Sequence, residues 1–363
     1  MSVDIGIIGL PRSGKTTIFN ALTLGAADTL HSAPNLGATK IPEPRLNMLA
    51  DILQPKRVVQ AEVQYIDIGA SVKGMAKDLS LSGELLNKLS QVDALIYVVR
   101  AFADERIPHF KGSVDVERDI AAADLALAFS DLAILEKRLQ RLEASLKGAK
   151  PAERQGFLRE QALLNRIYAE LEKEKPLREL ELTLEEAKTI VGYQFLSAKP
   201  LLLAVNIGEK QLPRADALEA ELCQRHAGPN RDLITICGKL ESELCQLDDS
   251  EAEVFRADLC VEESAATRII KRSFQLLGLL SFFSIASGEI RAWPIARGTN
   301  AVRAAGKIHS DMERGFIRAE VIGYEDLIDC GSLAEARKKG RLRLEGKNYI
   351  VQDGDVITFL FNV

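Results

Sequence analysis

The octapeptide Gly9-Leu10-Pro11-Arg12-Ser13-Gly14-Lys15-Thr16 constrains this chain most, because it has the spacing G-x-x-x-x-G-K-[ST]. It follows the apolar run Val3–Ile8 and precedes Lys15–Leu24, which has the composition of a helix. Glycines let such a loop curl until successive backbone N–H groups face one anion, and a helix N-terminus adds partial positive charge. The segment therefore predicts a strand, a phosphate-binding loop and a helix; the alternative is a glycine-rich turn without a ligand.

This loop assigns roles to its side chains. Lys15 is placed to reach the β- and γ-phosphates of a nucleoside triphosphate, and the Thr16 hydroxyl is placed to bind Mg²⁺. Asp67 ends the expected strand Val63–Ile66, where the second carboxylate that supports Mg²⁺ belongs, although acids often end strands. We expect the phosphates to be lined by Pro11, Arg12, Ser13, Gly14, Lys15, Thr16 and Thr17.

Four further strand-like segments predict the fold class. Val63–Asp67 is one of them. The other three, Ala94–Arg100, Leu201–Val205 and Leu233–Cys237, are continuous apolar runs that lack the alternation of half-buried strands, and helical segments separate them. Runs of this kind indicate a parallel sheet with helices on both faces. We therefore expect an α/β P-loop NTPase domain formed by residues 1–112 and 190–280.

The segment between these two parts has a helical period. Apolar residues recur every three or four positions over Leu125–Leu146, at Leu125, Phe129, Leu132, Leu135, Leu139, Leu142 and Leu146. A second helix is expected at Glu153–Glu174, so residues 113–189 are predicted to form an inserted, coiled-coil-like helical hairpin.

The C-terminal residues 281–363 are predicted to form a separate α+β domain. Short strand-like pieces alternate with turns, and the strongest turn signal is Gln352–Asp355. The expected strands are Glu289–Pro294, Phe316–Val321, Tyr349–Val351 and Val356–Phe361.

Charge and composition exclude several classes of protein. A net charge of −5 excludes a globally basic nucleic-acid binder, and we expect no sequence-specific DNA binding. Five cysteines without a C-x-x-C pair, and four scattered histidines, do not indicate a zinc site. Apolar runs are too short to cross a membrane, and the N-terminus does not have the pattern of a signal peptide, so a cytoplasmic protein with reduced thiols is expected.

Base recognition is expected at the end of another strand. Asn206-Ile207-Gly208-Glu209 follows Leu201–Val205, where GTPases generally carry N/T-K-x-D. Here Ile207 replaces the lysine and the longer Glu209 replaces the aspartate that accepts two hydrogens from guanine. The motif therefore does not favour guanine.

Taken together, these segments resemble the YchF-type, or Obg-like, ATPases of the Obg branch of P-loop translation-factor GTPases. The resemblance covers nearly the whole chain and rests on the P-loop and on Pro34–Gly37, Pro42–Leu46, Val92–Arg100, Leu135–Leu139, Asn206–Glu209, Ala305–Asp311, Gly315–Val321 and Gly346–Gly354. It implies a C-terminal TGS domain of the β-grasp fold, a preference for ATP over GTP, and association with ribosomes in translation or stress. It also implies that Cys237 and Gly238 line the base.

The chain departs from this family's pattern in its switch regions. Ala70 stands where D-x-x-G has its glycine, Ser71 replaces an apolar residue, Asp78–Gly83 replaces a glycine-rich switch, and His31 lies near the expected threonine, beside Ser32. Arg12 replaces an asparagine that helps related enzymes hold K⁺, and we hypothesise that its guanidinium supplies that charge; a solvent-facing arginine is the alternative.

Three functions remain open on this basis. The first is an ATPase with slow turnover, the second a nucleotide-binding module with negligible turnover, and the third a GTP-preferring switch protein. A basic cluster at Arg337, Lys338, Lys339, Arg341 and Arg343 is either an rRNA contact or a solvated surface.

Overall fold

The computed structural model describes residues 3–23, 35–67, 83–109, 111–259, 261 and 263–362. Their contacts divide the chain into two compact units. The P-loop unit comprises Asp4–Gly37 and Gln64–Arg272. The C-terminal unit comprises Met1–Val3, Ala38–Val63 and Ser273–Val363.

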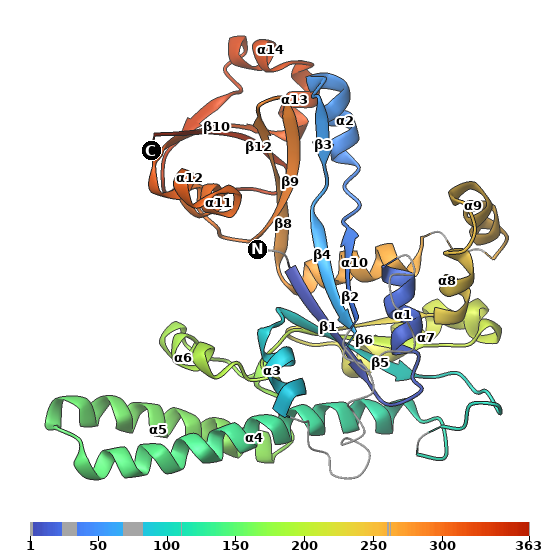
Figure 1. Cartoon of the computed structure of the whole chain (residues 1–363), viewed down its shortest axis with the longest axis vertical. Helices are drawn as coiled ribbons and strands as arrows, with labels where there is room; N and C mark the ends of the chain where they lie inside the picture. The colour runs from blue at the N-terminus through green and yellow to red at the C-terminus, as the bar shows by residue number, and fades with distance from the viewer. Residues whose placement is uncertain are drawn as a thin grey trace. The chain divides into compact units, whose positions relative to one another are not determined.

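The P-loop unit is built on a six-stranded sheet with the order β2-β4-β1-β5-β6-β7 (Figure 1). The strands are β1 Val3–Gly9, β2 Asn35–Lys40, β4 Glu62–Asp67, β5 Ala94–Arg100, β6 Leu201–Asn206 and β7 Arg231–Ile236. Strands β1, β5, β6 and β7 pair in parallel, and every residue of β5 and β6 is buried. The parallel sheet predicted from uniformly apolar runs is confirmed.

Helices complete this unit. They are α1 Lys15–Leu22, α3 Gly83–Gln91, α4 Val116–Gly148, α5 Pro151–Glu172, α6 Leu184–Ile190, α7 Ala215–His226, α8 Gly238–Leu244, α9 Asp249–Asp258 and α10 Ala265–Leu276. The predicted strand Leu233–Cys237 starts two residues late and ends one residue too far, because β7 is Arg231–Ile236 and Cys237 is the N-cap residue of α8. Helix α1 ends at Leu22, with Thr23 as its C-cap, before the predicted end at Leu24.

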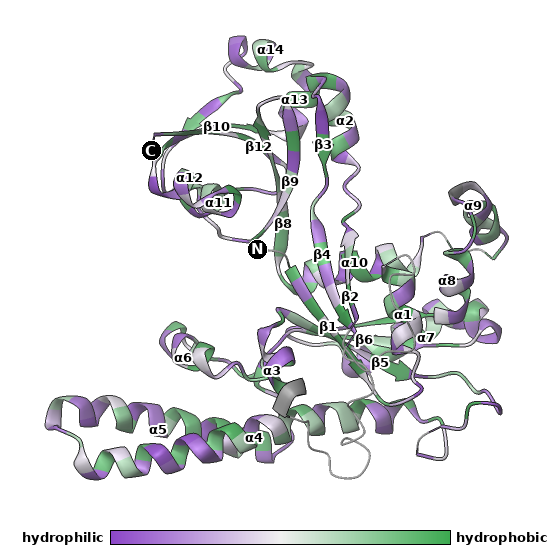
Figure 2. Cartoon of the chain, viewed as in Figure 1, coloured by the Kyte–Doolittle hydropathy of each residue, from purple (hydrophilic) through white to green (hydrophobic). Residues whose placement is uncertain are grey.

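The predicted helical hairpin is present as α4 and α5, which lie side by side (Figure 1). The apolar stripe of α4 is buried at Leu135 and Leu142, which pack with Leu164 and Ile167 of α5. Phe129 is the exception, since 45% of its side chain is exposed. Along both helices, hydrophilic residues alternate with hydrophobic ones (Figure 2).

The hairpin is tied to the sheet by buried charges. Asp131 of α4 accepts hydrogen bonds from the backbone N–H groups of Leu196 and Ser197, each at 2.8 Å, just before β6. Burial raises the pKa of the Asp131 carboxyl to about 6, although these hydrogen bonds oppose the shift. Asp124 of α4 also pairs with Arg178 at 3.0 Å and with Arg231, the first residue of β7, at 2.9 Å.

The C-terminal unit has its own sheet, with the order β11-β10-β12-β8-β9-β3. Its strands are β3 Arg57–Val59, β8 Leu279–Ala286, β9 Glu289–Ala296, β10 Phe316–Gly323, β11 Arg343–Glu345 and β12 Asp355–Phe361, and its helices are α2 Arg45–Leu53, α11 Ala301–Ile308, α12 Ser310–Arg314, α13 Tyr324–Cys330 and α14 Leu333–Lys338. The sheet is mixed, because β12 pairs in parallel with β8 and antiparallel with β10.

One predicted strand is wrong. Tyr349–Val351 forms only an isolated bridge between Ile350 and Asn300. Two backbone hydrogen bonds, Ala301 N–H to Tyr349 O and Val351 N–H to Thr299 O, hold this segment against the start of α11. Because its partner turns into a helix, no ladder can extend beyond the bridge.

Residues 38–63 group with the C-terminal unit, whereas the sequence-based division keeps them in the N-terminal domain. Strand β3 adds in parallel to the edge of β9. Arg45, at the start of α2, donates to Glu43 at 2.7 Å and to Asp353 at 2.9 Å, and its guanidinium lies over the Phe283 ring. Apart from the Arg45–Glu43 pair, these contacts join segments more than two hundred residues apart, so no local pattern in the sequence indicates them.

We predict that Asp131→Ala destabilises the protein and that the loss depends on pH. The variant leaves two buried N–H groups unpaired, which costs about 2–4 kcal/mol. Because the folded-state pKa is raised, the contribution of Asp131 is largest at low pH and declines as pH rises through about 6. Urea unfolding should show the gap between wild type and variant narrowing by about 1 kcal/mol from about pH 5 to pH 7. A gap that does not change with pH contradicts this account of Asp131.

We also predict that Arg45→Met destabilises the C-terminal unit by about 1–3 kcal/mol, because it leaves the buried Glu43 carboxylate without its cation. Arg57→Met is the matched control, since Arg57 is exposed and pairs with Glu289 only at 3.6 Å. The control should lose less than about 0.5 kcal/mol in the same urea titration. Equal losses in the two variants would show that the buried Arg45–Glu43 pair contributes no more to the free energy of unfolding than the exposed Arg57–Glu289 pair.

Candidate functional site

The loop between β1 and α1 has the backbone shape of an anion cradle. Gly14 is the N-cap residue of α1 and has a left-handed φ of 95°. A Cβ at Gly14 would lie 2.2 Å from Asn206 Nδ2, so only glycine fits there. Arg12 also has a positive φ, 63°, and its side chain is exposed. Pro11, Ser13, Gly14 and Thr17 lie in this loop or in the first turn of α1, and their contact with phosphates stays a prediction.

Lys15 lies folded back over this loop. Its ammonium Nζ donates to Gly9 O at 3.0 Å and to Leu10 O at 2.9 Å, and only 8% of the residue is exposed. Burial lowers the pKa of Lys15 to about 8, while the negative charge of Asp67 opposes that shift. An ammonium group has three donors, so a phosphate oxygen at the loop can take one of them.

Thr16 and Asp67 meet next to Lys15. Thr16 Oγ1 donates to Asp67 Oδ2 at 3.0 Å, and Asn35 Nδ2 lies 3.5 Å from the same oxygen. Asp67 is 1% exposed, and its other oxygen, Oδ1, is buried without a hydrogen-bond partner. A buried, unpaired carboxylate oxygen beside a hydroxyl suits a hard cation with oxygen ligands, so these residues fit Mg²⁺. In the described part of the chain no cluster of three His, Cys, Asp or Glu side chains offers an alternative metal site.

Asn206 joins the phosphate loop to the loop after β7. Its Nδ2 donates to Ser13 O at 2.9 Å, and its Oδ1 accepts from Gly238 N–H at 3.0 Å. Both atoms of the carboxamide are therefore used to hold two backbone segments together. The predicted direct contact of Asn206 with a base stays a prediction.

The other residues of the base motif differ from one another in exposure. Ile207 is buried in the core beside Cys237, whose thiol pKa is raised by burial. Glu209 is half exposed and its Oε1 accepts from Lys239 Nζ at 2.7 Å. Of the side chains predicted to read a base, only Glu209 is accessible; Cys237 and Gly238 can contribute only backbone groups.

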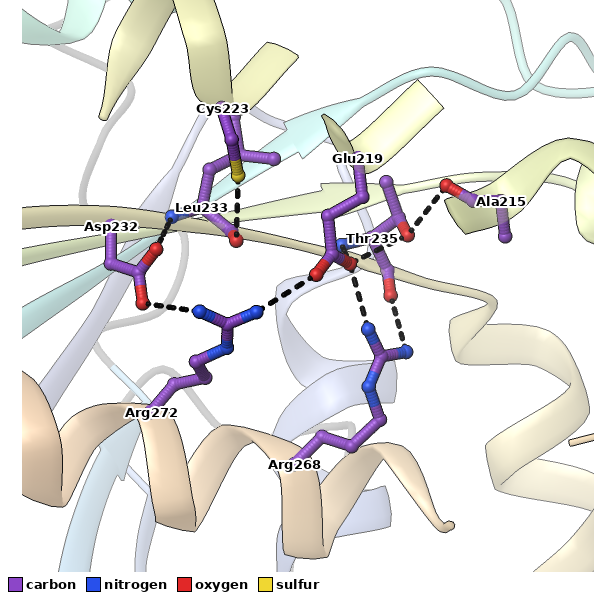
Figure 3. Close-up of polar contacts among 8 residues, drawn as sticks. All are labelled: Ala215, Glu219, Cys223, Asp232, Leu233, Thr235, Arg268 and Arg272. Carbon is purple, nitrogen blue, oxygen red and sulfur yellow. Dashed lines mark hydrogen bonds and ion pairs between the residues drawn. The ribbon is translucent and has the colours of Figure 1, made fainter. Parts of the chain in front are cut away.

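Strand β7, which leads into Cys237 and Gly238, is held by a charged network (Figure 3). Glu219 of α7 accepts from Thr235 N–H at 2.7 Å and from Thr235 Oγ1 at 2.9 Å. Arg268 and Arg272 of α10 donate to the same carboxylate at 2.7 and 3.2 Å. This network fixes the end of β7 from both sides, and with it the position of the Gly238 N–H group.

A buried arginine beside the site, Arg100, belongs to none of the sequence motifs. Arg100, the last residue of β5, donates to Phe102 O at 3.1 Å and to Ile107 O at 2.7 Å, and stacks on the Phe102 ring. It shapes residues 101–109, where Pro108 O accepts from Arg12 Nη1 at 3.4 Å. The signal was an arginine ending a strand that is otherwise apolar. The hypothesis that Arg12 replaces K⁺ stays a prediction.

Several predicted features lie outside the described residues. They are His31, Ser32, Ala70, Ser71 and, apart from Gly83, the segment Asp78–Gly83.

The basic cluster near the C-terminus is described, and most of its charges are paired with carboxylates. Arg337 pairs with Glu320, Lys338 with Glu335, Arg341 with Asp326, and Arg343 with Glu345. This pairing favours a solvated surface over a contact with RNA phosphates.

Among the described helices, none is long and apolar enough to cross a membrane.

Two family models match the chain. A model described as "50S ribosome-binding GTPase" matches residues 4–138, and the YchF GTPase C-terminal model, described as "Protein of unknown function", matches residues 279–362.

Similar proteins cover the chain from end to end. "Ribosome-binding ATPase YchF" of Bacillus subtilis is 40% identical over 100% of both chains, and that of Escherichia coli O157:H7 is 36% identical over the same shares. The solved structure of the Schizosaccharomyces pombe YchF GTPase superposes with a TM-score of 0.85, at 28% identity over 99% of this chain and 98% of that one. With a P-loop GTPase fold, a matching C-terminal domain and full-length identity at this level, the chain belongs to the YchF family.

Proposed function

We propose that this protein binds ATP with Mg²⁺ at the Gly9–Thr17 loop, hydrolyses it slowly and associates with ribosomes. The observation that carries the proposal is the meeting of Lys15, Thr16 and Asp67 at the N-terminus of α1. An ammonium, a hydroxyl and a buried carboxylate oxygen lie there within reach of one anion and one divalent cation. Ribosome association is supported by the names of the relatives, and a cytoplasmic location fits it.

Each residue has a stated part in this proposal. The backbone N–H groups of residues 12–16 bind the β-phosphate, and Lys15 bridges to the γ-phosphate. Thr16 and Asp67 hold Mg²⁺, which neutralises charge on the transferred phosphoryl group when bound. The sequence singles out no general base, and phosphoryl transfer depends mainly on positioning and charge. Slow hydrolysis therefore does not require a general base at this place.

A preference for ATP is supported by the Glu209–Lys239 pair. Lys239 occupies Oε1 of Glu209, which leaves one carboxylate oxygen for a base. The adenine amino group is one donor, whereas guanine presents two neighbouring donors that need both oxygens of a carboxylate. A singly available acceptor therefore favours adenine.

We predict that Lys15→Ala lowers steady-state ATP turnover by about 100-fold or more, because the ammonium that stabilises transferred charge is lost. Lys210→Ala removes an exposed lysine near the base motif and should leave turnover unchanged. ATP binding by the wild type should also require Mg²⁺. Tight binding with turnover no faster in wild type than in Lys15→Ala would identify a nucleotide-binding module instead.

We predict that wild type prefers ATP and that Lys239→Met shifts the preference toward GTP by about tenfold, or about 1.4 kcal/mol. The substitution removes the ammonium from Oε1 of Glu209 while keeping most of the length of the side chain. Competition of unlabelled ATP or GTP with a fluorescent nucleotide measures the preference of wild type and its shift in Lys239→Met. If wild type favours GTP by tenfold, the protein is a GTP-preferring switch and the role given to Glu209 is wrong.

A further inference from the structure

The end of the helical hairpin far from the sheet has a charge opposite to that of the chain as a whole. Residues 137–159, called here the hairpin tip, contain seven lysines and arginines and two glutamates. The whole chain has 47 Lys and Arg against 52 Asp and Glu, so the rest of the protein is clearly acidic. Figure 1 shows that the turn between α4 and α5 lies at the end of the hairpin away from the sheet.

Six of the seven cations of the tip are exposed and unpaired among the described residues. Only Arg138 has a carboxylate partner, Glu160, at 2.7 Å. The other six are exposed, and within the described residues they form no ion pair: Lys137, Arg141, Lys147, Lys150, Arg154 and Arg159. This contrasts with the cluster at Arg337–Arg343, where neighbouring acids neutralise most charges. The tip thus keeps its positive charge available to a partner.

The opposite end of the hairpin is held firmly, so the tip is carried on a rigid support. Asp131 is bonded to the backbone before β6, and Asp124 pairs with Arg178 and Arg231. Along the hairpin, leucines of α4 pack against those of α5. At about 1.5 Å per residue, the helix places Lys147 about 24 Å beyond Asp131.

The chemistry of the tip favours a polyanion over a protein partner. Its apolar side chains, such as Leu142, face the interior of the hairpin, and Leu158 is the one large apolar side chain exposed between residues 137 and 159. Protein interfaces need buried apolar or aromatic anchors, which this surface lacks. Phosphate backbones need only clustered cations, and exposed lysines and arginines on helices supply them without base recognition.

We propose that the hairpin tip binds the phosphate backbone of folded RNA without sequence specificity. This inference rests on the proposed association with ribosomes, whose RNA is the partner of matching charge. The hairpin tip and the nucleotide site share no residue. Each lysine or arginine that meets a phosphate releases counterions, so the affinity must fall steeply with salt.

The test uses the full-length protein and a fluorescent RNA duplex of about 20 base pairs, with binding followed by anisotropy from about 50 to about 300 mM salt. The tip variant is Arg141→Ala, Lys147→Ala and Arg154→Ala combined. The control variant, Lys173→Ala, Lys175→Ala and Lys188→Ala combined, removes the same charge from exposed residues outside the tip. Thermal unfolding and nucleotide affinity should be unchanged in both variants.

Wild type should bind the duplex, and the tip variant should bind about tenfold or more weakly with a salt slope shallower by about 2. The control should stay within about twofold of wild type, and Arg141→Lys with Arg154→Lys should retain binding, because charge and not shape is used. Equal losses in tip and control variants, or no loss in either, overturn the proposal. So does a wild type that binds phosphatidylserine vesicles but not RNA.

Co-sedimentation with purified ribosomes separates this proposal from the proposed function. If wild type and tip variant co-sediment equally, ribosome association stands and the role of the tip is wrong. If wild type does not co-sediment but the duplex result is as expected, ribosome association is wrong and the RNA-binding tip stands.

Discussion

The carboxamide of Asn206 is the contact on which the candidate site depends. It donates to Ser13 O in the phosphate loop and accepts from Gly238 N–H in the loop after β7, and so joins the ends of β6 and β7 to the start of α1. Because a Cβ at residue 14 would overlap its Nδ2 atom, the same contact requires the glycine of the P-loop motif. One buried side chain thus fixes the distance between the loop before α1 and the loop after β7.

Other buried polar groups extend this rigid frame. Glu219 clamps β7 to α7 and α10 (Figure 3), and Arg100 shapes the segment after β5. Asp131 and Asp124 attach the hairpin to the chain at the starts of β6 and β7. Each is a polar group whose burial is compensated by several partners, which makes its geometry specific. The protein therefore combines a fixed nucleotide cradle with a firmly attached arm whose end is free and basic.

Much of this could be predicted from the sequence, because the informative signals are local. The P-loop spacing, uniformly apolar strands and the period of α4 identified the parallel sheet and the hairpin. Contacts between segments far apart in the sequence could not be predicted from local patterns. Two examples are the pairing of β3 with β9 and the ion pair between Arg45 and Asp353. Tyr349–Val351 has a strand-like composition, but its partner becomes a helix after Asn300.

The candidate site shows the same division. Lys15, Thr16 and Asp67 meet as expected, since a motif and the end of a strand place them. Two contacts depend on loop geometry that the spacing of the motifs does not encode. The side-chain Nδ2 and Oδ1 atoms of Asn206 both bond to backbone groups, and Lys239 pairs with Glu209. Likewise, the pairing of Arg337 and Arg341 with acids is invisible in a linear run of basic residues.

The most direct measurement is a crystal structure of the protein with Mg²⁺ and a non-hydrolysable ATP analogue. The account predicts the ion between the Thr16 hydroxyl and the phosphates, with Asp67 beside it and the Lys15 ammonium turned from the carbonyls of Gly9 and Leu10 toward the γ-phosphate. Phosphates bound elsewhere, with Lys15 still on those carbonyls and no ion at Thr16, would contradict it.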